Sequence, residues 1–328
     1  MKNYYKIGLR HLSKLTSFST VLLIFVGALV KSHEVGLSVP DWPTTYGKQM
    51  FAFPLSEMVG GIFYEHGHRM LATIIGFFTL IQAIVLGFSN EPYWLKKLGY
   101  IALGTVISQG IFGGITVLFY LPPAVSIIHG ILAQTFFVMT IIIAYSLSVE
   151  RKKRKNIIDN TNIRKGTLIL VSFVYIQLIL GALMRHTASG MAIPDFPTMG
   201  GLWFPTFSDS MIHNINVILF DMDWGTVSRA QVIIHFLHRL GAIIVTGFIG
   251  YLFYKNNKII NTNSILKKSM WLILFIVIVQ FTLGALTVIT ERAPYIASFH
   301  VVNGAALLGA CILFVLRIHP IKYSEWFK

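Results

Sequence analysis

Residues 65–88 read EHGHRMLATIIGFFTLIQAIVLGF, an apolar run that begins with two histidines and an arginine. A helix needs about 20 apolar residues to cross the hydrocarbon of a bilayer, and this run is long enough. A related stretch, His235-Phe236-Leu237-His238-Arg239, opens another apolar run late in the chain. Titratable side chains in membrane-spanning segments are costly unless they have partners, so both stretches indicate a functional site.

Apolar runs of this length recur along the chain, in which 55% of residues are hydrophobic and 12% are charged. Soluble domains carry about a quarter charged residues. We therefore predict an all-α membrane protein without a large soluble domain. Its membrane-spanning helices are predicted at about 15–31, 59–88, 98–119, 124–149, 166–185, 230–254, 269–290 and 295–317.

The net charge of +14 is unevenly distributed. Lys and Arg gather in the segments that share a side with the N-terminus, including the run Arg151-Lys152-Lys153-Arg154-Lys155. This asymmetry predicts that both termini lie in the cytoplasm of a multi-pass membrane protein. We interpret the basic run as an anchor near anionic lipid, not as a nucleic-acid contact.

The two halves of the chain resemble one another. Pro40-Asp41-Trp42-Pro43 matches Pro194-Asp195-Phe196-Pro197 at an offset of 154, whereas His68 matches His238 at an offset of 170. The difference (170 − 154 = 16) predicts 16 extra residues between Thr198 and Arg229. We expect Asp41 and Asp195, each flanked by prolines, to build turns that shape a lid over the site.

Each repeat holds four predicted helices, so both repeats should have the same orientation in the membrane. The predicted architecture is two tandem four-helix bundles with a parallel internal repeat. Residues 1–150 form the N-terminal half, 151–165 a basic cytoplasmic linker and 166–328 the C-terminal half.

Four histidines occupy matching places in the repeats: His68 with His129, and His238 with His300. All four fall roughly 8–15 Å below the outer interface, at 1.5 Å of rise per residue. Facing helices of a bundle commonly hold a cofactor between them, which predicts two bis-imidazole metal sites. Haem is the favoured group. Zinc is the weaker alternative, because it would need four ligands per site.

Arg69 and Arg239 directly follow His68 and His238. The planar guanidinium suits carboxylates, so we predict that both arginines bind haem propionates. Snorkelling to the lipid headgroups is the alternative.

The repeats differ where Glu65 aligns with His235. Glu65 lies one helical turn before His68, so the two side chains can face one pocket. A carboxylate near a haem edge could take up a proton or stabilise positive charge, which predicts a reactive N-terminal half and an electron-transfer C-terminal half. The alternative is an ion pair between Glu65 and Arg69.

A Gln-x-x-x-Gly pattern occurs as Gln109/Gly113, Gln177/Gly181 and Gln280/Gly284. It is typical of close helix packing in membranes, with glutamine as an interhelical hydrogen-bonding group. Glycines that clear space for a porphyrin face are the other interpretation.

Together these residues resemble the heme A synthases of bacteria and mitochondria, over essentially the whole chain. The likeness rests on Glu65-x-x-His68-Arg69, on His235-x-x-His238-Arg239, on His129 and His300, and on the two Pro-Asp-aromatic-Pro loops. The first outer loop lacks the cysteine pair that some members carry, so a thiol-based step would not apply to this chain.

The resemblance implies heme b bound by His238 and His300, and heme O received near His68 and His129, with Glu65 needed for activity. The implied reaction oxidises the C8 methyl of heme O to the formyl of heme A by two hydroxylations. It also implies the bacterial plasma membrane, with a heme O synthase and cytochrome oxidase assembly factors as partners. Homo-oligomerisation stays open.

Two other functions remain at this point. One is a diheme electron carrier that binds both haems permanently and makes no product. The other is a haem transporter or chaperone without chemistry. The difference between Glu65 and His235 favours the enzyme, because a pure electron carrier has less reason to differ there.

Overall fold

The computed structural model describes residues 4–154, 161–261 and 263–319, which fold as a bundle of long helices. Among these residues, eight helices are long and apolar enough to cross a membrane, which confirms the predicted all-α membrane class. They are α1 (Tyr4–Ser32), α2 (Gly61–Phe88), α3 (Tyr93–Leu118), α4 (Pro123–Ser146), α6 (Thr161–His186), α8 (Arg229–Asn261), α9 (Ser264–Ile289) and α10 (Pro294–Ile318).

Several of these helices are longer than their apolar runs. The first begins at Tyr4 instead of residue 15, and α8 ends at Asn261 instead of residue 254. A hydropathy run marks only the part of a helix that lipid surrounds, while hydrogen bonding continues into polar residues beyond it. Pro123 and Pro294 occupy the first turns of α4 and α10, where a missing N–H costs nothing.

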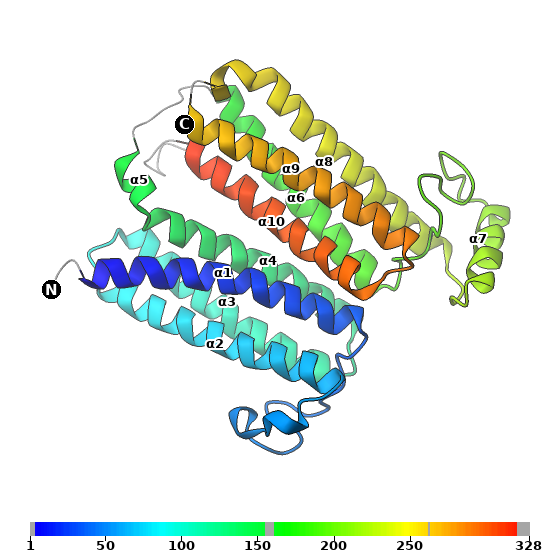
Figure 1. The fold of residues 1–328 in the computed structure, drawn as a ribbon, viewed down its shortest axis with the longest axis horizontal. Helices are drawn as coiled ribbons and strands as arrows, with labels where there is room; N and C mark the ends of the chain where they lie inside the picture. Colours follow the sequence, from blue (N-terminus) through cyan, green and yellow to red (C-terminus); the bar gives the residue numbers. More distant parts are fainter. Residues whose placement is uncertain (1–3, 155–160, 262, 320–328) are drawn as a thin grey trace.

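The eight long helices form two groups of four, shown side by side in Figure 1. In the first group, α1 to α4, each helix packs on the next and α4 returns to α1. In the second group, α6, α8, α9 and α10, α6 packs on α8, α8 on α9, α9 on α10 and α10 on α6. Each group has its own apolar core, centred on residues such as Ile75 and Leu86 or Ile249 and Phe314.

The groups meet through four helices, because α1 and α4 both contact α10 and α4 also contacts α6. The short helix α5 (Val149–Lys153) follows α4 at the end of the bundle where α1 begins and α10 ends. Of the predicted linker 151–165, residues 155–160 lie outside the described part. The division of the chain into two domains with a linker remains a prediction.

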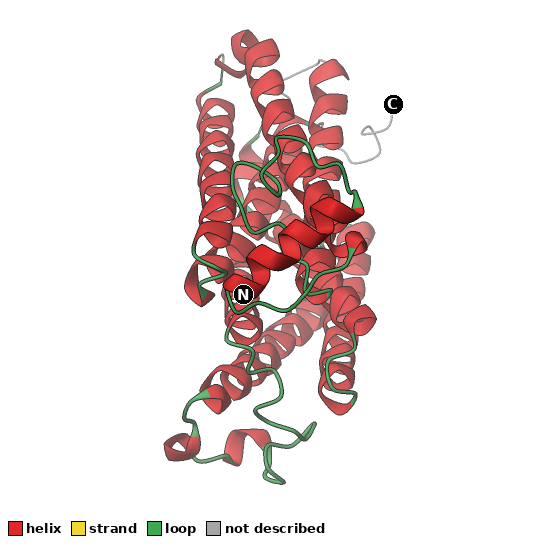
Figure 2. Cartoon of the chain, turned by 90° about the vertical axis from the view of Figure 1, so that its right-hand side faces the viewer, coloured by secondary structure: helices red, strands yellow, loops and turns green. Residues whose placement is uncertain are grey.

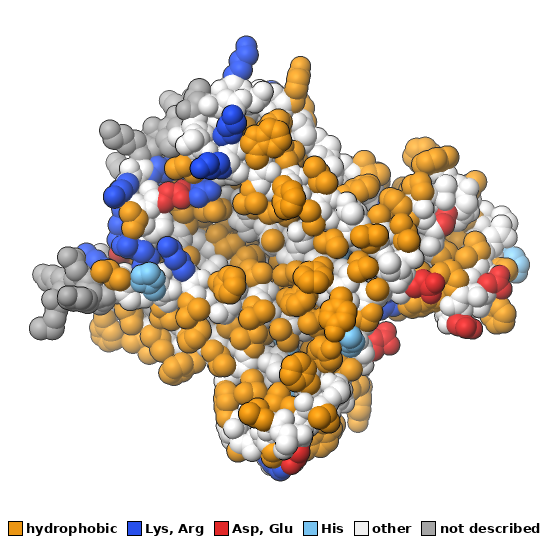
Figure 3. All heavy atoms as spheres, viewed as in Figure 1, with side chains coloured by type: hydrophobic (Ala, Val, Ile, Leu, Met, Phe, Trp, Pro, Cys, Tyr) orange, Lys and Arg blue, Asp and Glu red, His pale blue; other side chains and the backbone are white. Residues whose placement is uncertain are grey.

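The outer surface of the bundle is apolar. Large side chains such as Phe18, Phe88 and Phe275 are exposed on the helices, as expected for lipid-facing positions. Lys and Arg gather near the end of the molecule where α1 begins and α10 ends, whereas that concentration is missing around the opposite loops in the view of Figure 3. This distribution matches the charge asymmetry that predicts the orientation in the membrane.

Two folded loops cover the other end of the bundle, as Figure 2 shows from that side. The first loop contains two short 3-10 helices, η1 (Met50–Ala52) and η2 (Leu55–Glu57). The second contains α7 (Asp209–Asp221), a helix absent from the prediction, within the residues inserted relative to the first repeat. Its buried Met211, Ile215 and Leu219 recur every four residues. This face of α7 packs on residues 191–193 of the same outer loop.

Candidate functional site

Both outer loops are built around an aspartate. Asp41 accepts hydrogen bonds from the N–H groups of Tyr46 and Gly47 (2.8 and 2.9 Å), and Asp195 accepts them from Gly200 and Gly201 (2.6 and 2.9 Å). Burial raises the pKa of Asp41, but these bonds and one from a threonine hydroxyl outweigh it and lower the pKa to about 2. The pKa of Asp195 is also lowered, because similar bonds outweigh its burial. The predicted role of these aspartates as turn-builders is confirmed.

Arg69 fastens the first loop to α2. Its guanidinium donates to the backbone carbonyls of Asp41 and Val39 (both 2.7 Å) and Thr44 (3.2 Å). It also donates to Glu65 Oε1 at 2.6 Å, and both side chains of this ion pair are buried. The remaining oxygen of Glu65 accepts the Val39 N–H at 2.8 Å. The ion pair therefore exists, and Glu65 is a fixed carboxylate on the wall of the cavity described below.

The second loop is fastened in the same way with one change. Arg239 donates to the carbonyls of Ile193 (2.9 Å) and Thr198 (3.0 Å), and its Nε–H points to His235 Nε2 at 3.1 Å. The Ile193 N–H lies 3.2 Å from the other ring nitrogen of His235. A neutral imidazole accepts at only one nitrogen, whereas a carboxylate accepts at both oxygens. Glu65 therefore suits its two donors better than His235 does.

The two arginines differ in charge balance as a result. Arg69 is neutralised by Glu65, but the described residues give Arg239 no carboxylate within ion-pair distance. The bonds of Arg69 occupy four of the five guanidinium donors, and those of Arg239 occupy three. Arg239 is consequently the better equipped of the two to meet an anionic ligand.

One continuous cavity of about 1740 Å³ joins the two groups of helices. All four predicted histidine ligands line it, together with Glu65, Arg69, His235 and Arg239. Pockets for small ligands usually measure about 300–1,000 Å³, so this cavity has room for more than one large planar group. The structure thus brings every sequence-predicted site residue to the wall of one chamber.

The histidine pair of the second group has the spacing of a shared metal. The rings of His238 and His300 have centroids 6.3 Å apart, with an interplanar angle of 73°. Two rings bonded to one metal at about 2 Å, each nitrogen about 1 Å from its ring centre, would stand about 6 Å apart. No group of three or more His, Cys, Asp or Glu that could hold a metal ion occurs among the described residues. Two-ligand sites fit haem, because its porphyrin supplies the remaining donors.

Each of the four histidines lies against a glycine of a neighbouring helix. A Cβ added at Gly27 would lie 2.9 Å from His68 Cε1, and one at Gly181 3.2 Å from His238 Cε1. A Cβ added at Gly284 would lie 3.1 Å from His300 Cε1, and one added at Gly113 would lie 3.5 Å from His129 Cε1. In these contacts Gly27 and the three glycines of the Gln-x-x-x-Gly pattern make room for imidazole rings.

The glutamines of the same pattern form hydrogen bonds between helices, as the packing interpretation predicts. Gln109 donates to the backbone carbonyl of His129 at 2.9 Å, and Gln177 donates to that of His238 at 2.8 Å. Gln280 approaches the His300 ring at 3.3 Å. Their direct contact with the histidines was not predicted, although their constant spacing from the glycines was a usable signal.

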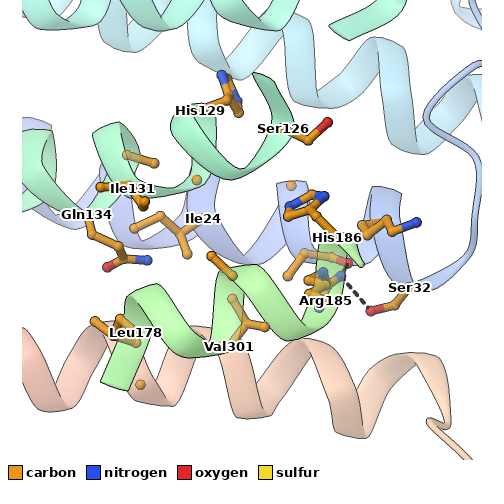
Figure 4. A pocket seen from close by; sticks show the side chains of 18 of the residues that line it. Ile24, Ser32, Ser126, His129, Ile131, Gln134, Leu178, Arg185, His186 and Val301 are labelled. Carbon is orange, nitrogen blue, oxygen red and sulfur yellow. Dashed lines mark hydrogen bonds between the residues drawn. The ribbon is translucent and has the colours of Figure 1, made fainter. Parts of the chain in front are cut away.

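Arg185 is a further residue that sequence reasoning missed. It lines the cavity near the end of α6 and donates to the Ala28 carbonyl (2.7 Å) and to Ser32 Oγ (3.0 Å) of α1. Figure 4 shows it beside His186, across the cavity from His129 and Ser126 of α4. Its alignment with Lys31, another cavity residue, was the available signal. Arg185 therefore ties the two groups together at the end covered by the loops.

Two other histidines, His66 and His33, contact side chains outside the histidine pairs. His66 is buried under the first loop, where its Nδ1 lies 2.9 Å from Thr45 Oγ1, so it contacts the loop and not the cavity. His33 stacks on Tyr64 with ring centroids 4.6 Å apart. Its neighbour Glu34 lines the cavity and lies 3.6 Å from Arg292.

Two groups of four long helices, with a cavity between them that histidines of both groups line, define a class of polytopic membrane proteins with room for large planar ligands. Residues 10–312 match the COX15-CtaA family of cytochrome oxidase assembly proteins, and the chain belongs to that family. Heme A synthase of Staphylococcus saprophyticus is 28% identical over 324 residues, covering 94% of this chain and 95% of the relative.

Other bacteria supply similar relatives. Heme A synthase of Shewanella oneidensis is 27% identical over 340 residues, which cover 97% of this chain and 96% of the relative. Heme A synthase of Lysinibacillus sphaericus is 24% identical over 322 residues, or 94% of each chain. The match to these enzymes extends over nearly their whole length.

Proposed function

We propose that this chain is an oxidoreductase of the membrane that converts heme O to heme A. The observation that carries the proposal is the single cavity lined by both histidine pairs and, in the first group, by a buried carboxylate. The family match over residues 10–312 supports the same reaction and does not favour a plain electron carrier or a transporter.

The reaction converts a methyl group to a formyl group on the substrate porphyrin. The first hydroxylation gives a hydroxymethyl group, and the second gives a hydrate that loses water to leave the aldehyde. Each hydroxylation removes two electrons from the carbon and adds one oxygen atom, so the reaction needs both an external oxidant and a source of oxygen such as water or dioxygen. The chain's contribution is to bind, orient and shield the substrate, and to hold charge where it develops.

The second group is proposed to hold a resident heme b through His238 and His300. Their 6.3 Å ring separation and the unneutralised Arg239 support this assignment, with Arg239 facing a propionate. A six-coordinate haem of this kind supplies one-electron transfer when bound. The propionate-facing role proposed for Arg69 is weaker, because Arg69 is already paired with Glu65.

The first group is proposed to receive heme O, with His68 and His129 as its ligands. Glu65 is the group that distinguishes this site from the other. Arg69 and the Val39 N–H hold its carboxylate in place at the cavity wall. We assign it the stabilisation of positive charge on the substrate and the uptake of the protons released on oxidation.

The bilayer setting is proposed to be the bacterial plasma membrane, with both termini in the cytoplasm and the histidine pairs near the outer leaflet. The basic end of the molecule supports this orientation. Heme O synthase and cytochrome oxidase assembly factors are the proposed partners, because substrate and product are apolar haems that must pass between membrane proteins.

The experiment is expression of the chain with a supply of heme O, followed by pigment extraction and mass analysis. The proposal expects a new haem that has gained one oxygen and lost two hydrogens. A pigment that stays heme O while both histidine pairs are loaded would support the electron-carrier alternative and overturn the proposal.

A further inference from the structure

The cavity reaches deeper in the first group of helices than in the second. Along α2 its lining extends from His68 to Leu80 (80 − 68 = 12 residues), which is about 18 Å of helix at 1.5 Å per residue. Along α8 the lining extends from His238 only to Thr246 (246 − 238 = 8 residues), which is about 12 Å. The first group therefore adds about one helical turn of depth, on the side of the histidines away from the outer loops.

The deeper part of this cavity is a trench between α2 and α3. Six lining residues define it, three from each helix: Gly76, Phe77 and Leu80, and Leu103, Ile107 and Gly110. Phe77 is 59% exposed and Ile107 is 56% exposed, so the protein's own side chains do not fill the trench. A Cβ added at Gly76 or Gly110 would meet nothing within 4 Å. The trench is open space that continues from the site of His68.

Larger residues occupy the positions of the two trench glycines in the second group. At the offset of 170 that relates the histidines of α2 and α8, Gly76 corresponds to Thr246. At the offset of 171 that relates α3 to α9, Gly110 corresponds to Phe281. The Phe281 ring packs edge to face on Phe196 of the second outer loop, with ring centroids 6.3 Å apart. A side chain therefore stands in the second group where the first group has free space.

The walls of the trench are also particular to the first group. Phe77 and Leu80 correspond to Gly247 and Gly250 of α8 at the same offset of 170. Neither glycine lines the cavity. Without side chains at these positions, α8 cannot form one wall of a trench. The first group thus has a cleared floor and raised walls, and the second group has neither.

The cavity changes from charged to apolar along its length. Lys31, Arg185 and Arg292 line it near the outer loops. The six trench residues at the other end carry no polar side-chain atom. A ligand with carboxylates at one edge and an apolar chain at the other would be held in a single orientation, with its anionic edge toward the cations.

Heme O is a ligand of this kind. It carries a long isoprenoid tail at the porphyrin edge remote from its two propionates, whereas heme b has no such tail. We propose that the trench between α2 and α3 binds the isoprenoid tail of heme O and directs the tailed haem to the first group. Thr246 and Phe281 leave the second group fitted to a haem without a tail. The inference rests on the proposed function, since it assumes a haem site in each group.

The size of the preference follows from the medium that the tail leaves. In detergent or lipid the tail is already in apolar surroundings, so close packing in the trench supplies the preference, not escape from water. On the order of ten new carbon contacts correspond to roughly tenfold in affinity. We therefore expect the first group to bind heme O about tenfold more tightly than heme b.

The test measures this preference with and without the trench. Full-length His238→Ala protein, in which only the first group retains both histidines, is titrated in detergent with heme O and with heme b, without an added oxidant. Gly76→Thr with Gly110→Phe should bring the ratio of the two affinities close to one and leave heme b binding unchanged. Gly104→Phe is the matched control. Gly104 lies on α3 outside the cavity with open space around it, so its substitution should preserve the tenfold preference.

A second measurement uses the protein with all four histidines. It is incubated with equal amounts of both haems, and the bound pigments are then extracted and counted, with any heme A added to the heme O total. Native protein should yield one tailed haem and one heme b per chain.

The reverse exchange builds a trench in the second group. Thr246→Gly and Phe281→Gly clear the floor, and Gly247→Phe with Gly250→Leu adds the wall. A Cβ at either of these two glycines meets nothing within 4 Å, so the helices can accept the change. This protein should take up more than one tailed haem per chain, a gain that misfolding would not produce.

The outcomes separate this inference from the proposed reaction. Equal affinity of the native first group for both haems, or a preference that Gly76→Thr with Gly110→Phe leaves intact, overturns the inference even if heme A is formed. A trench that holds a lipid acyl chain instead of the haem tail would give that equal affinity. A tenfold preference that the exchange abolishes, without heme A formation, upholds the inference and overturns the proposed reaction.

Discussion

The first and second groups of helices place equivalent histidines in one cavity but surround them with different chemistry. Among the described residues, the first group has a buried carboxylate and rings whose Nδ1 atoms have no hydrogen-bond partner. The second group has an arginine without a carboxylate partner and rings that glutamine amides approach. The cavity wall thus carries histidines at matching sequence positions, while the charges and hydrogen bonds around them differ. The difference teaches that a ligand set alone does not tell a reactive site from a resident one.

The largest expected effect comes from removing a ligand of the second group. His238→Ala should abolish resident haem in the purified protein, because one imidazole cannot form the six-coordinate site. Pigment extraction measures the haem per chain. His66→Ala is the matched control, since His66 contacts the loop at Thr45, and it should retain haem. Full haem content in His238→Ala protein would show that the ligand assignment is wrong.

The buried arginines should differ in their contribution to stability. Arg69→Gln leaves Glu65 buried without its ion-pair partner, which should cost about 3 kcal/mol or more. Arg239→Gln breaks only bonds to loop carbonyls and to His235, so about 1–2 kcal/mol is expected. Thermal unfolding of haem-free protein in detergent compares the two. A larger loss for Arg239→Gln would contradict the charge balance described for these loops.

Substitution of Glu65 tests whether the carboxylate of the first group takes part in the reaction. Glu65→Gln should reduce heme A formation by about 100-fold, while resident haem in the second group is retained. Heme A formation is measured by extraction and mass analysis, and resident haem by its absorbance. Substitution of the aligned residue in the second group, His235→Gln, should reduce heme A formation much less. Undiminished heme A output from Glu65→Gln would exclude the catalytic role.

The smallest effect concerns the loop turns. The pKa of Asp41 is lowered to about 2 in the folded protein, below the usual value near 4. Its stabilising contribution is therefore complete above pH 4 and is lost as the pH falls through 2. Asp41→Asn should cost about 1 kcal/mol at pH 7, and that cost should shrink between pH 4 and pH 2. Unfolding measured at several pH values checks this, and a cost that stays constant would contradict it.

Much of this fold could be predicted from the sequence because membrane crossing imposes length and apolarity. The eight spans follow from that rule, whereas α7 was missed because Asn and His residues break up its apolar spacing. The Ser208 cap before Met211, Ile215 and Leu219 was a usable signal. The site residues were predictable as a set from the repeat. Their contacts were not, since the Gln177–His238 contact depends on how α6 and α8 rotate against each other.

The two groups are also fastened to one another by side chains at opposite ends of the bundle. Arg185 reaches from α6 to the Ala28 carbonyl at 2.7 Å, and Arg317 of α10 pairs with Glu150 of α5 at 2.7 Å. These side-chain contacts do not depend on a peptide bond between the two groups. Two polypeptides, translated separately as residues 1–154 and 161–328, should find each other in the bilayer and reconstitute haem binding.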